Sequence, residues 1–283
     1  MKMLKCCKLN LMQWRIQPKY IIVLCFLILH TFDQVFPYKA FAQSAGLKIA
    51  PWLLSGLVRG SNWYMITMLA YILLISDAPF LNRQQQFVLQ RVGKIHWLRG
   101  QLLYLLVQSF LVAMLTWVMS WCFLLPEVEW TTQWGSGIQS ASRHTVGYMV
   151  RPPFVVYTHV LKNWSAVGAT AWVFLMQILI GLFLGELVLV CNLWTRRGIG
   201  VSLAVFWVLL YATVKIWSQS AGFVKYLAWI SPLCWMDLTL TGDTGIYQPP
   251  LWYAAVVLIL LCVGLAVFAL CNIHKCSLDM DKE

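Results

Sequence analysis

Glu186 is the residue whose place in the sequence most strongly invites a chemical role. It lies in the apolar run GLFLGELVLVCN. A carboxylate inside a membrane-spanning helix requires a partner or water. Two interpretations stay open: Glu186 lines a translocation path or contacts another span, or it approaches the headgroups near Arg196 and Arg197. Asp237, in a segment interrupted by Pro232, is either part of an extracellular gate or a solvated turn residue.

Known catalytic patterns are missing from the rest of the chain. There is no HExxH, no CxxC, and no GxxxxGK[ST]; Gly93-Lys94 is followed by Ile95 and lacks the upstream glycine. The five histidines are scattered, and Ser136 lies in a Gly-Ser-Gly turn with no base placed near it by the sequence. We therefore predict no catalytic residue, no metal ligand and no cofactor bound by this chain.

Composition points to an integral membrane protein. Of 283 residues, 60% are hydrophobic and only 11% are charged, and the mean hydropathy is +0.71. Soluble domains carry about a quarter of their residues as charges. The net charge of +11 is explained by the accumulation of Lys and Arg in cytoplasmic loops, so no nucleic-acid partner is expected.

Six apolar stretches are candidates for transmembrane helices, since a bilayer core of about 30 Å needs roughly 20 apolar residues. Their ranges are about 20–36, 51–76, 102–125, 166–193, 198–217 and 251–271. The first is the weakest, and a cleaved signal peptide ending near Ala40-Phe41-Ala42 is the alternative to a retained helix. Arg59 and Asn62 interrupt the second, which qualifies if it begins as an amphipathic entry.

The basic residues favour an amino terminus inside the cell. With both termini cytoplasmic, the inner segments hold thirteen Lys and Arg residues and the outer segments hold eight. The loops 126–165 and 218–250 then face outward, and the interrupted segment 221–240 is a re-entrant or interfacial hairpin before the last span. The amino-terminal residues with Lys2, Lys5, Lys8 and Arg15 predict an interfacial helix on the cytoplasmic leaflet.

A polar, basic segment at 77–101 separates the second and third spans. Asn82 is placed to cap a short helix and Gly93 to end it, and Val88 and Val92 start an apolar stripe. The polar face is rich in glutamine, whereas helices that rest on lipid usually carry mainly Lys and Arg. From these residues alone, a lipid surface and a groove in a partner protein are equal alternatives.

The run SDAPFLNRQQQFVLQRVGKIHWLRGQLLYLLVQSFLV resembles the membrane permeases of bacterial ABC exporters, in the six-span type 2 class. The positions that carry the resemblance are Asp77, Pro79, Phe80, Arg91, Gly93 and Trp97. It implies that 82–93 is a coupling helix seated in a groove of a separate ABC ATPase subunit, which would bind ATP and Mg²⁺. The residues expected to meet that subunit are Asn82, Arg83, Gln86, Phe87, Gln90 and Arg91.

The sequence-based hypothesis is an all-α integral membrane protein whose 283 residues form a single transmembrane permease domain. It is expected in the bacterial plasma membrane, exporting substrate while a partner chain hydrolyses ATP. Because six helices make a thin wall for a pathway, a second copy or a related permease is expected to form a dimer with it. The alternatives are a secondary transporter or a sensor component and, less favoured, an intramembrane enzyme.

Overall fold

The computed structural model is almost wholly helical and describes residues 2–60, 62–80, 83–142, 158–195, 198–217, 224–242 and 248–275. Within these residues there is no strand, only an isolated bridge between Ile49 and Val128. Five helices are long and apolar enough to cross a membrane. They are α2 (Pro18–Ala45), α6 (Lys94–Cys122), α9 (Ala166–Trp194), α10 (Ile199–Trp217) and α12 (Leu251–Asn272), which the 3-10 turn η3 (Ile273–Lys275) extends. The chain therefore has the all-α fold of a multi-pass membrane protein.

The predicted span 51–76 is two helices rather than one. α3 (Leu54–Gly60) and α4 (Trp63–Ile75) are separated near Asn62, one of the two polar residues that interrupt the apolar pattern. α4 has 13 residues, which amount to about 20 Å of helix, less than a bilayer core. It is apolar on all sides and mostly buried, as expected of a helix enclosed by others.

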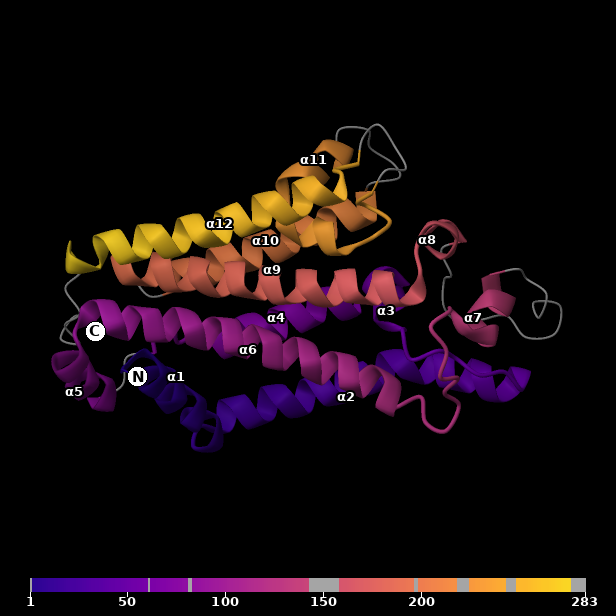
Figure 1. Ribbon diagram of the computed structural model, residues 1–283, viewed down its shortest axis with the longest axis horizontal. Helices are drawn as coiled ribbons and strands as arrows, with labels where there is room; N and C mark the ends of the chain where they lie inside the picture. Colours follow the sequence, from indigo (N-terminus) through magenta and orange to yellow (C-terminus); the bar gives the residue numbers. More distant parts are fainter. Residues whose placement is uncertain are drawn as a thin grey trace.

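α9 is the centre of the bundle and packs against α6, α10 and α12, and also against α3 and α4. Figure 1 shows α6 and α2 on one side of α9 and α10 and α12 on the other. The two described ends of the chain, α1 (Lys2–Met12) and η3, lie at the same end of the bundle as α5 (Arg83–Val92). We call this the α5 end. The opposite, α7 end carries α7 (Gly135–Ser142) and α8 (Thr158–Asn163) (Figure 1).

Glycines on α9 let it approach α6 closely. A Cβ added to Gly181 would lie 3.0 Å from Ser109 Oγ, and one added to Gly185 would lie 2.9 Å from Leu105 Cδ2. Lipid tails are as apolar as the side chains of these helices, so the hydrophobic effect does not drive the helices together. Small residues that allow tight packing hold such pairs together instead. Gly181 and Gly185 thus permit the close packing of α9 on α6.

The predicted amino-terminal helix exists as α1, and it packs on the first turns of α6 as well as presenting an apolar surface. Cys6 is buried against Gly100, and Asn10 Nδ2 donates to Gln101 Oε1 over 2.7 Å. Leu4 and Met12 stay exposed, as an interfacial helix requires. The 3-10 turn η1 (Gln13–Arg15) then leads into α2.

The first predicted span ends nine residues too early, because α2 continues from residue 36 to Ala45. Its buried face runs on through Val35, Tyr38 and Phe41. Polar residues near position 30 suggested the end of the span, but packing against α4 and α6 keeps the chain helical. The interrupted segment before the last span is helical in two pieces, α11 (Val224–Ile230) and the buried 3-10 turn η2 (Pro232–Met236).

Replacing Gly100 with alanine is expected to displace α1. The new Cβ would lie 2.5 Å from Cys6 Cβ and 3.2 Å from the Met3 carbonyl oxygen, so the helices must separate. Burial raises the pKa of the Cys6 thiol above its ordinary value, which keeps it unreactive in the native protein. Gly100→Ala should therefore increase the rate of Cys6 modification by a maleimide, followed by mass spectrometry.

Gly264→Ala is the matched control, because a Cβ on this helical glycine of α12 meets nothing within 4 Å. Its Cys6 labelling rate should equal that of the wild type. Equal rates for Gly100→Ala and the wild type would show that α1 does not depend on this contact.

Candidate functional site

α5 presents a projecting surface at the end of the bundle. Phe87 is 68% exposed, and Gln90 and Arg91 are also exposed. Leu89 of α5 and Ile95 of α6 pack against the hydrophobic core, so this side of the segment faces the bundle. Gly93 ends α5 with a φ of +84°, a backbone conformation that favours glycine, as predicted. An exposed phenylalanine beside polar side chains is therefore available to a partner.

Part of the predicted coupling surface cannot be compared with this geometry. Asn82 lies outside the described residues, and for Arg83 and Gln86 only the helical backbone is described. Their assignment to a partner interface stays a prediction. The start of α5 at Arg83 agrees with a helix that begins after position 82.

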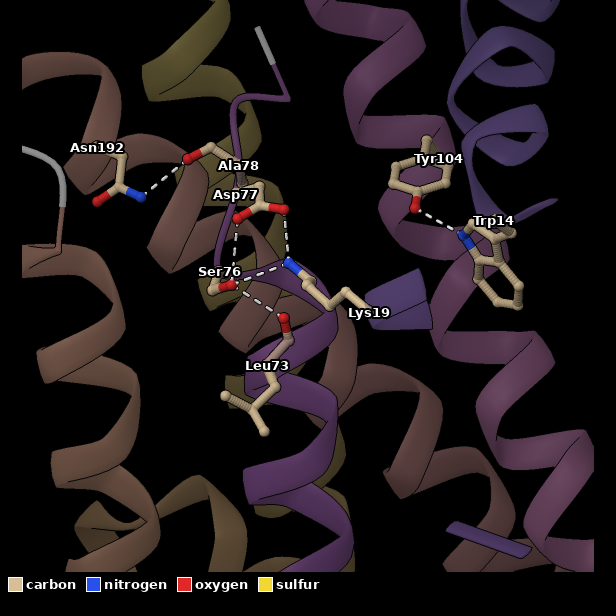
Figure 2. Close-up of polar contacts among 8 residues, drawn as sticks. All are labelled: Trp14, Lys19, Leu73, Ser76, Asp77, Ala78, Tyr104 and Asn192. Atoms are coloured by element: carbon tan, nitrogen blue, oxygen red, sulfur yellow. Dashed lines mark hydrogen bonds and ion pairs between the residues drawn. The ribbon is translucent and has the colours of Figure 1, made fainter. Parts of the chain in front are cut away.

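The segment joining α4 to α5 is tied to α2 by a lysine. Lys19 Nζ donates to Asp77 Oδ2 over 2.6 Å and to Ser76 Oγ over 3.0 Å (Figure 2). The Ser76 hydroxyl donates in turn to the Leu73 carbonyl over 2.9 Å. Because the two charged side chains are 29% and 52% exposed, water screens this ion pair, and it serves geometry more than stability.

The same segment is tied to α9 and α6 on its other side. Asn192 Nδ2 donates to the Ala78 carbonyl over 2.8 Å (Figure 2), and Asn192 Oδ1 accepts from the Gly200 N–H of α10 over 3.2 Å. The Phe80 ring packs edge-on against Tyr104 of α6, with ring centroids 5.0 Å apart. We call Ser76–Phe80 the junction. It connects α5 to three long helices, α2, α6 and α9.

Tyr104 also joins the junction to the amino terminus. Trp14 Nε1 donates to the Tyr104 hydroxyl over 2.9 Å (Figure 2), and Trp14 stacks on Tyr20 with centroids 5.7 Å apart. Aromatic pairs of this kind add about 1 kcal/mol each beyond the area they bury. The acidic-Pro-Phe pattern singled out from the sequence is thus a structural hub between α2, α6 and α9. Asn192, and Trp14 beside Tyr104, gave no signal in the sequence.

Glu186 is buried inside the bundle. It is 3% exposed, and its Oε2 atom has no hydrogen-bond partner in the part of the chain that the structure describes. It interacts electrostatically with Tyr71 of α4 and Cys262 of α12. The carboxylate therefore lies among helices rather than at the surface near the end of α9.

Asp237 lies in a turn, as one interpretation predicted, but it is 1% exposed rather than solvated. Its Oδ1 atom accepts from the Thr239 N–H over 2.9 Å and from the Thr239 hydroxyl over 2.7 Å. A carboxylate that bonds the backbone two residues on stabilises the turn itself. The assignment of Asp237 to an extracellular gate stays a prediction.

Ser136 lies at the start of α7, where the Glu129 carboxylate caps the helix. Its N–H and its hydroxyl each donate to Glu129 Oε2 over 2.9 Å, at the amino-terminal end of α7. A carboxylate at this position complements the helix dipole. The flanking glycines allow close contact with the preceding loop, since a Cβ on Gly135 would lie 2.8 Å from the Ala50 nitrogen and one on Gly137 would lie 2.8 Å from the Lys48 carbonyl oxygen.

Tryptophans at the α7 end hold separate segments of the chain together. Four of their indole N–H groups donate to backbone carbonyls. The bonds run from Trp52 to Thr131, from Trp134 to Trp164, from Trp172 to Trp235 and from Trp235 to Ala228, over 2.6–3.1 Å. A large apolar ring with one donor suits this packing role, because it fills space and at the same time donates a hydrogen bond to a backbone carbonyl.

Asn192→Leu is expected to loosen the junction. The substitution leaves the Ala78 carbonyl and the Gly200 N–H unpaired in a buried place, which costs about 1–3 kcal/mol per group. The midpoint of thermal unfolding in detergent should fall by several degrees. Asn272→Leu is the control, because Asn272 bonds only the Phe268 carbonyl of its own helix, and it should leave the midpoint nearly unchanged.

The cap on α7 is expected to weaken in acid. The hydrogen bonds from Ser136 hold the pKa of the Glu129 carboxyl below its ordinary value of 4.5. A lowered pKa means that the cap stabilises α7 above pH 4.5 and that this stabilisation is lost as the pH falls through the lowered pKa. Amide-exchange protection of residues 136–142 should therefore drop at low pH in the wild type.

Glu129→Gln should lower that protection at neutral pH and remove its dependence on acid. Glu127→Gln is the matched control in the same loop and should behave as the wild type. Protection that is independent of pH in the wild type would contradict the role of the carboxylate.

No family model, curated protein or solved structure matches this chain. The functional interpretation therefore depends on two features of the chain itself: the sequence pattern at 76–112 and the geometry that surrounds it. At the coarse level, the chain is an all-α, multi-pass membrane protein.

Proposed function

We propose that this chain is the membrane permease subunit of an ATP-driven exporter of the ABC type 2 class, and that α5 is its coupling helix. The observation that carries the proposal is the projecting Phe87 on a short helix whose base is tied into the bundle. Aromatic side chains that fill a pocket are the usual anchors of protein interfaces. Gln90 and Arg91 beside it supply hydrogen bonds at the rim.

The junction supports this function because it offers a mechanical connection. A displacement of α5 moves Asp77 and Ala78, which are held by Lys19 of α2 and Asn192 of α9. Phe80 passes the same displacement to α6 through Tyr104. ATP binding that closes two ATPase subunits would thus reach several spans together, and the spans would reorganise so that substrate passes.

Several partners belong to the proposal. The sequence has no phosphate-binding GxxxxGK[ST] loop, so a separate ATPase subunit binds ATP and Mg²⁺. A second copy of this chain, or a related permease, completes the pathway, and it and lipid cover the exposed apolar residues of α12 such as Leu260 and Val263. The protein resides in the bacterial plasma membrane with the α5 end in the cytoplasm. The alternatives are a secondary transporter or sensor component without an ATPase partner and, less favoured, an intramembrane enzyme.

Co-purification tests this function directly. The detergent-solubilised wild type should recover a nucleotide-binding ATPase, and Phe87→Glu/Arg91→Glu should lose it, because the exposed phenylalanine and the cation are replaced by acids. Recovered ATPase is measured by mass spectrometry and by nucleotide binding. We expect at least a tenfold loss, corresponding to about 1.4 kcal/mol of binding free energy.

Lys5→Glu/Lys8→Glu is the control for charge, because these exposed lysines lie on α1 at the same end of the bundle. It should recover the ATPase as the wild type does. If the wild type brings down no ATPase, the exporter function is wrong and α5 is a lipid-facing helix. If the control also loses it, the effect of the first variant is one of overall charge.

A further inference from the structure

A cluster of buried polar side chains lies where four helices meet. Tyr71 of α4 and Ser109 of α6 share a hydrogen bond of 2.7 Å, and Ser109 packs against Gly181 of α9. Glu186 of α9 interacts electrostatically with Tyr71 and with Cys262 of α12. The side chains of Tyr71, Ser109, Glu186 and Cys262 are each at most 5% exposed, and Ser109 covers Gly181. The cluster is therefore closed from the lipid.

Gln108 lies at nearly the same depth as Glu186. Ser109 is opposite Gly181 and Leu105 is opposite Gly185, so α6 and α9 run past each other in opposite directions. Gln108 adjoins Ser109 and Glu186 adjoins Gly185. At 1.5 Å per residue, the two polar residues are separated by about one helical turn along the bundle.

Both residues hold unused hydrogen-bonding groups. Gln108 is 0% exposed, and among the described residues neither its Nε2 nor its Oε1 atom has a partner, nor does Oε2 of Glu186. Native proteins contain few buried polar atoms without a hydrogen bond, and each one requires an explanation. In a membrane-spanning helix, an ionisable residue turned to the bundle interior marks a pathway for ions or substrate.

The cluster has a negative group and no positive one. Glu186 forms no ion pair with a described residue. The sequence of α4, α9 and α12 contains no Lys or Arg, and α6 contains none after Arg99. A buried carboxylate without a counter-charge is costly, and a ligand that brings a positive charge removes that cost whereas a neutral or anionic ligand does not.

Building on the proposed function, on which this step rests, we infer that the cluster binds an ammonium group of the transported substrate. Glu186 supplies the opposite charge and Gln108 Oε1 accepts a hydrogen bond from the ammonium. Tyr71 offers a ring face, which attracts cations. The substrate class is therefore an amphipathic molecule with an amine, whose apolar part lies among the surrounding side chains.

A pair of fluorescent probes that differ in one charge tests this inference. Dansylcadaverine carries an ammonium at pH 7, and N-acetyl-dansylcadaverine is its neutral counterpart. Each is titrated into the wild type in phosphatidylcholine nanodiscs, with empty nanodiscs subtracted. The wild type should bind the charged probe at least ten times more tightly than the neutral one.

Glu186→Gln should abolish that preference, since the amide has the shape of the carboxyl but no charge. Its affinity for the neutral probe should stay within twofold of the wild type, which also reports that the variant is folded. Glu186→Asp should retain part of the preference, and Glu127→Gln, in a loop, should retain all of it. Equal binding of the two probes, an unchanged preference in Glu186→Gln, or no binding by the wild type would each overturn the inference.

The two hypotheses fail separately. Co-purification of the ATPase depends on α5, so Glu186→Gln should recover it as the wild type does. An ATPase that is recovered without any preference for the charged probe overturns the ammonium site alone. A preference for the charged probe without an ATPase leaves a cation site in a protein that is not an ABC permease.

Discussion

Close contact between α6 and α9 is the constraint on which the rest of the fold depends. Lipid surrounds a membrane protein with material as apolar as its own side chains, so dispersion and hydrogen bonds must hold the helices together. Gly181 and Gly185 bring α9 within van der Waals contact of Ser109 and Leu105. Gln177 Nε2 adds a bond of 3.1 Å to Thr116 Oγ1 farther along the same contact. The other helices then pack around this pair, and α9 gains neighbours on all sides.

This contact explains how the bundle can carry polar groups. Side chains that face the α6–α9 contact have no access to lipid, so they cannot be satisfied by moving to the surface. Some of these side chains bond to each other, as Tyr71 and Ser109 do. Other side chains have donors or acceptors without a partner among the described residues. The junction at the α5 end is different, because Lys19, Asp77 and Asn192 satisfy its polar groups nearly completely. Polar groups of the described residues are thus hydrogen-bonded at the junction and partly unpaired at the α6–α9 contact.

The sequence predicted the long, continuously apolar helices α9, α10 and α12 better than the short or interrupted ones. α9, α10 and α12 begin and end within one residue of their predicted limits, since their apolar runs are long and end in polar residues. α4 and the far end of α2 were misjudged because enclosure by other helices, rather than hydropathy, decides their length. Gly93 was recognised because it supplies a positive φ that few other residues tolerate.

The candidate site was predictable only where residue type alone is informative. Glu186 and the acidic-Pro-Phe pattern are visible in the sequence, because charge or proline in such places is unusual. Trp14, Asn192 and Gln108 are not, since they are separated from their neighbours in space by many residues of chain. Asp237 shows the opposite case. It is conspicuous in the sequence, but its carboxylate accepts a hydrogen bond within its own turn.

The short length of α4 has a consequence for how the bilayer acts on this protein. Spans that touch lipid must match its hydrocarbon thickness, and a mismatch is relieved by tilting or by deforming the membrane. α4 packs on α2, α9 and α10, and Leu73 is its one exposed side chain, so membrane thickness acts on it mainly through its neighbours. Thicker or thinner bilayers tilt the outer helices around a core whose own dimensions stay constant.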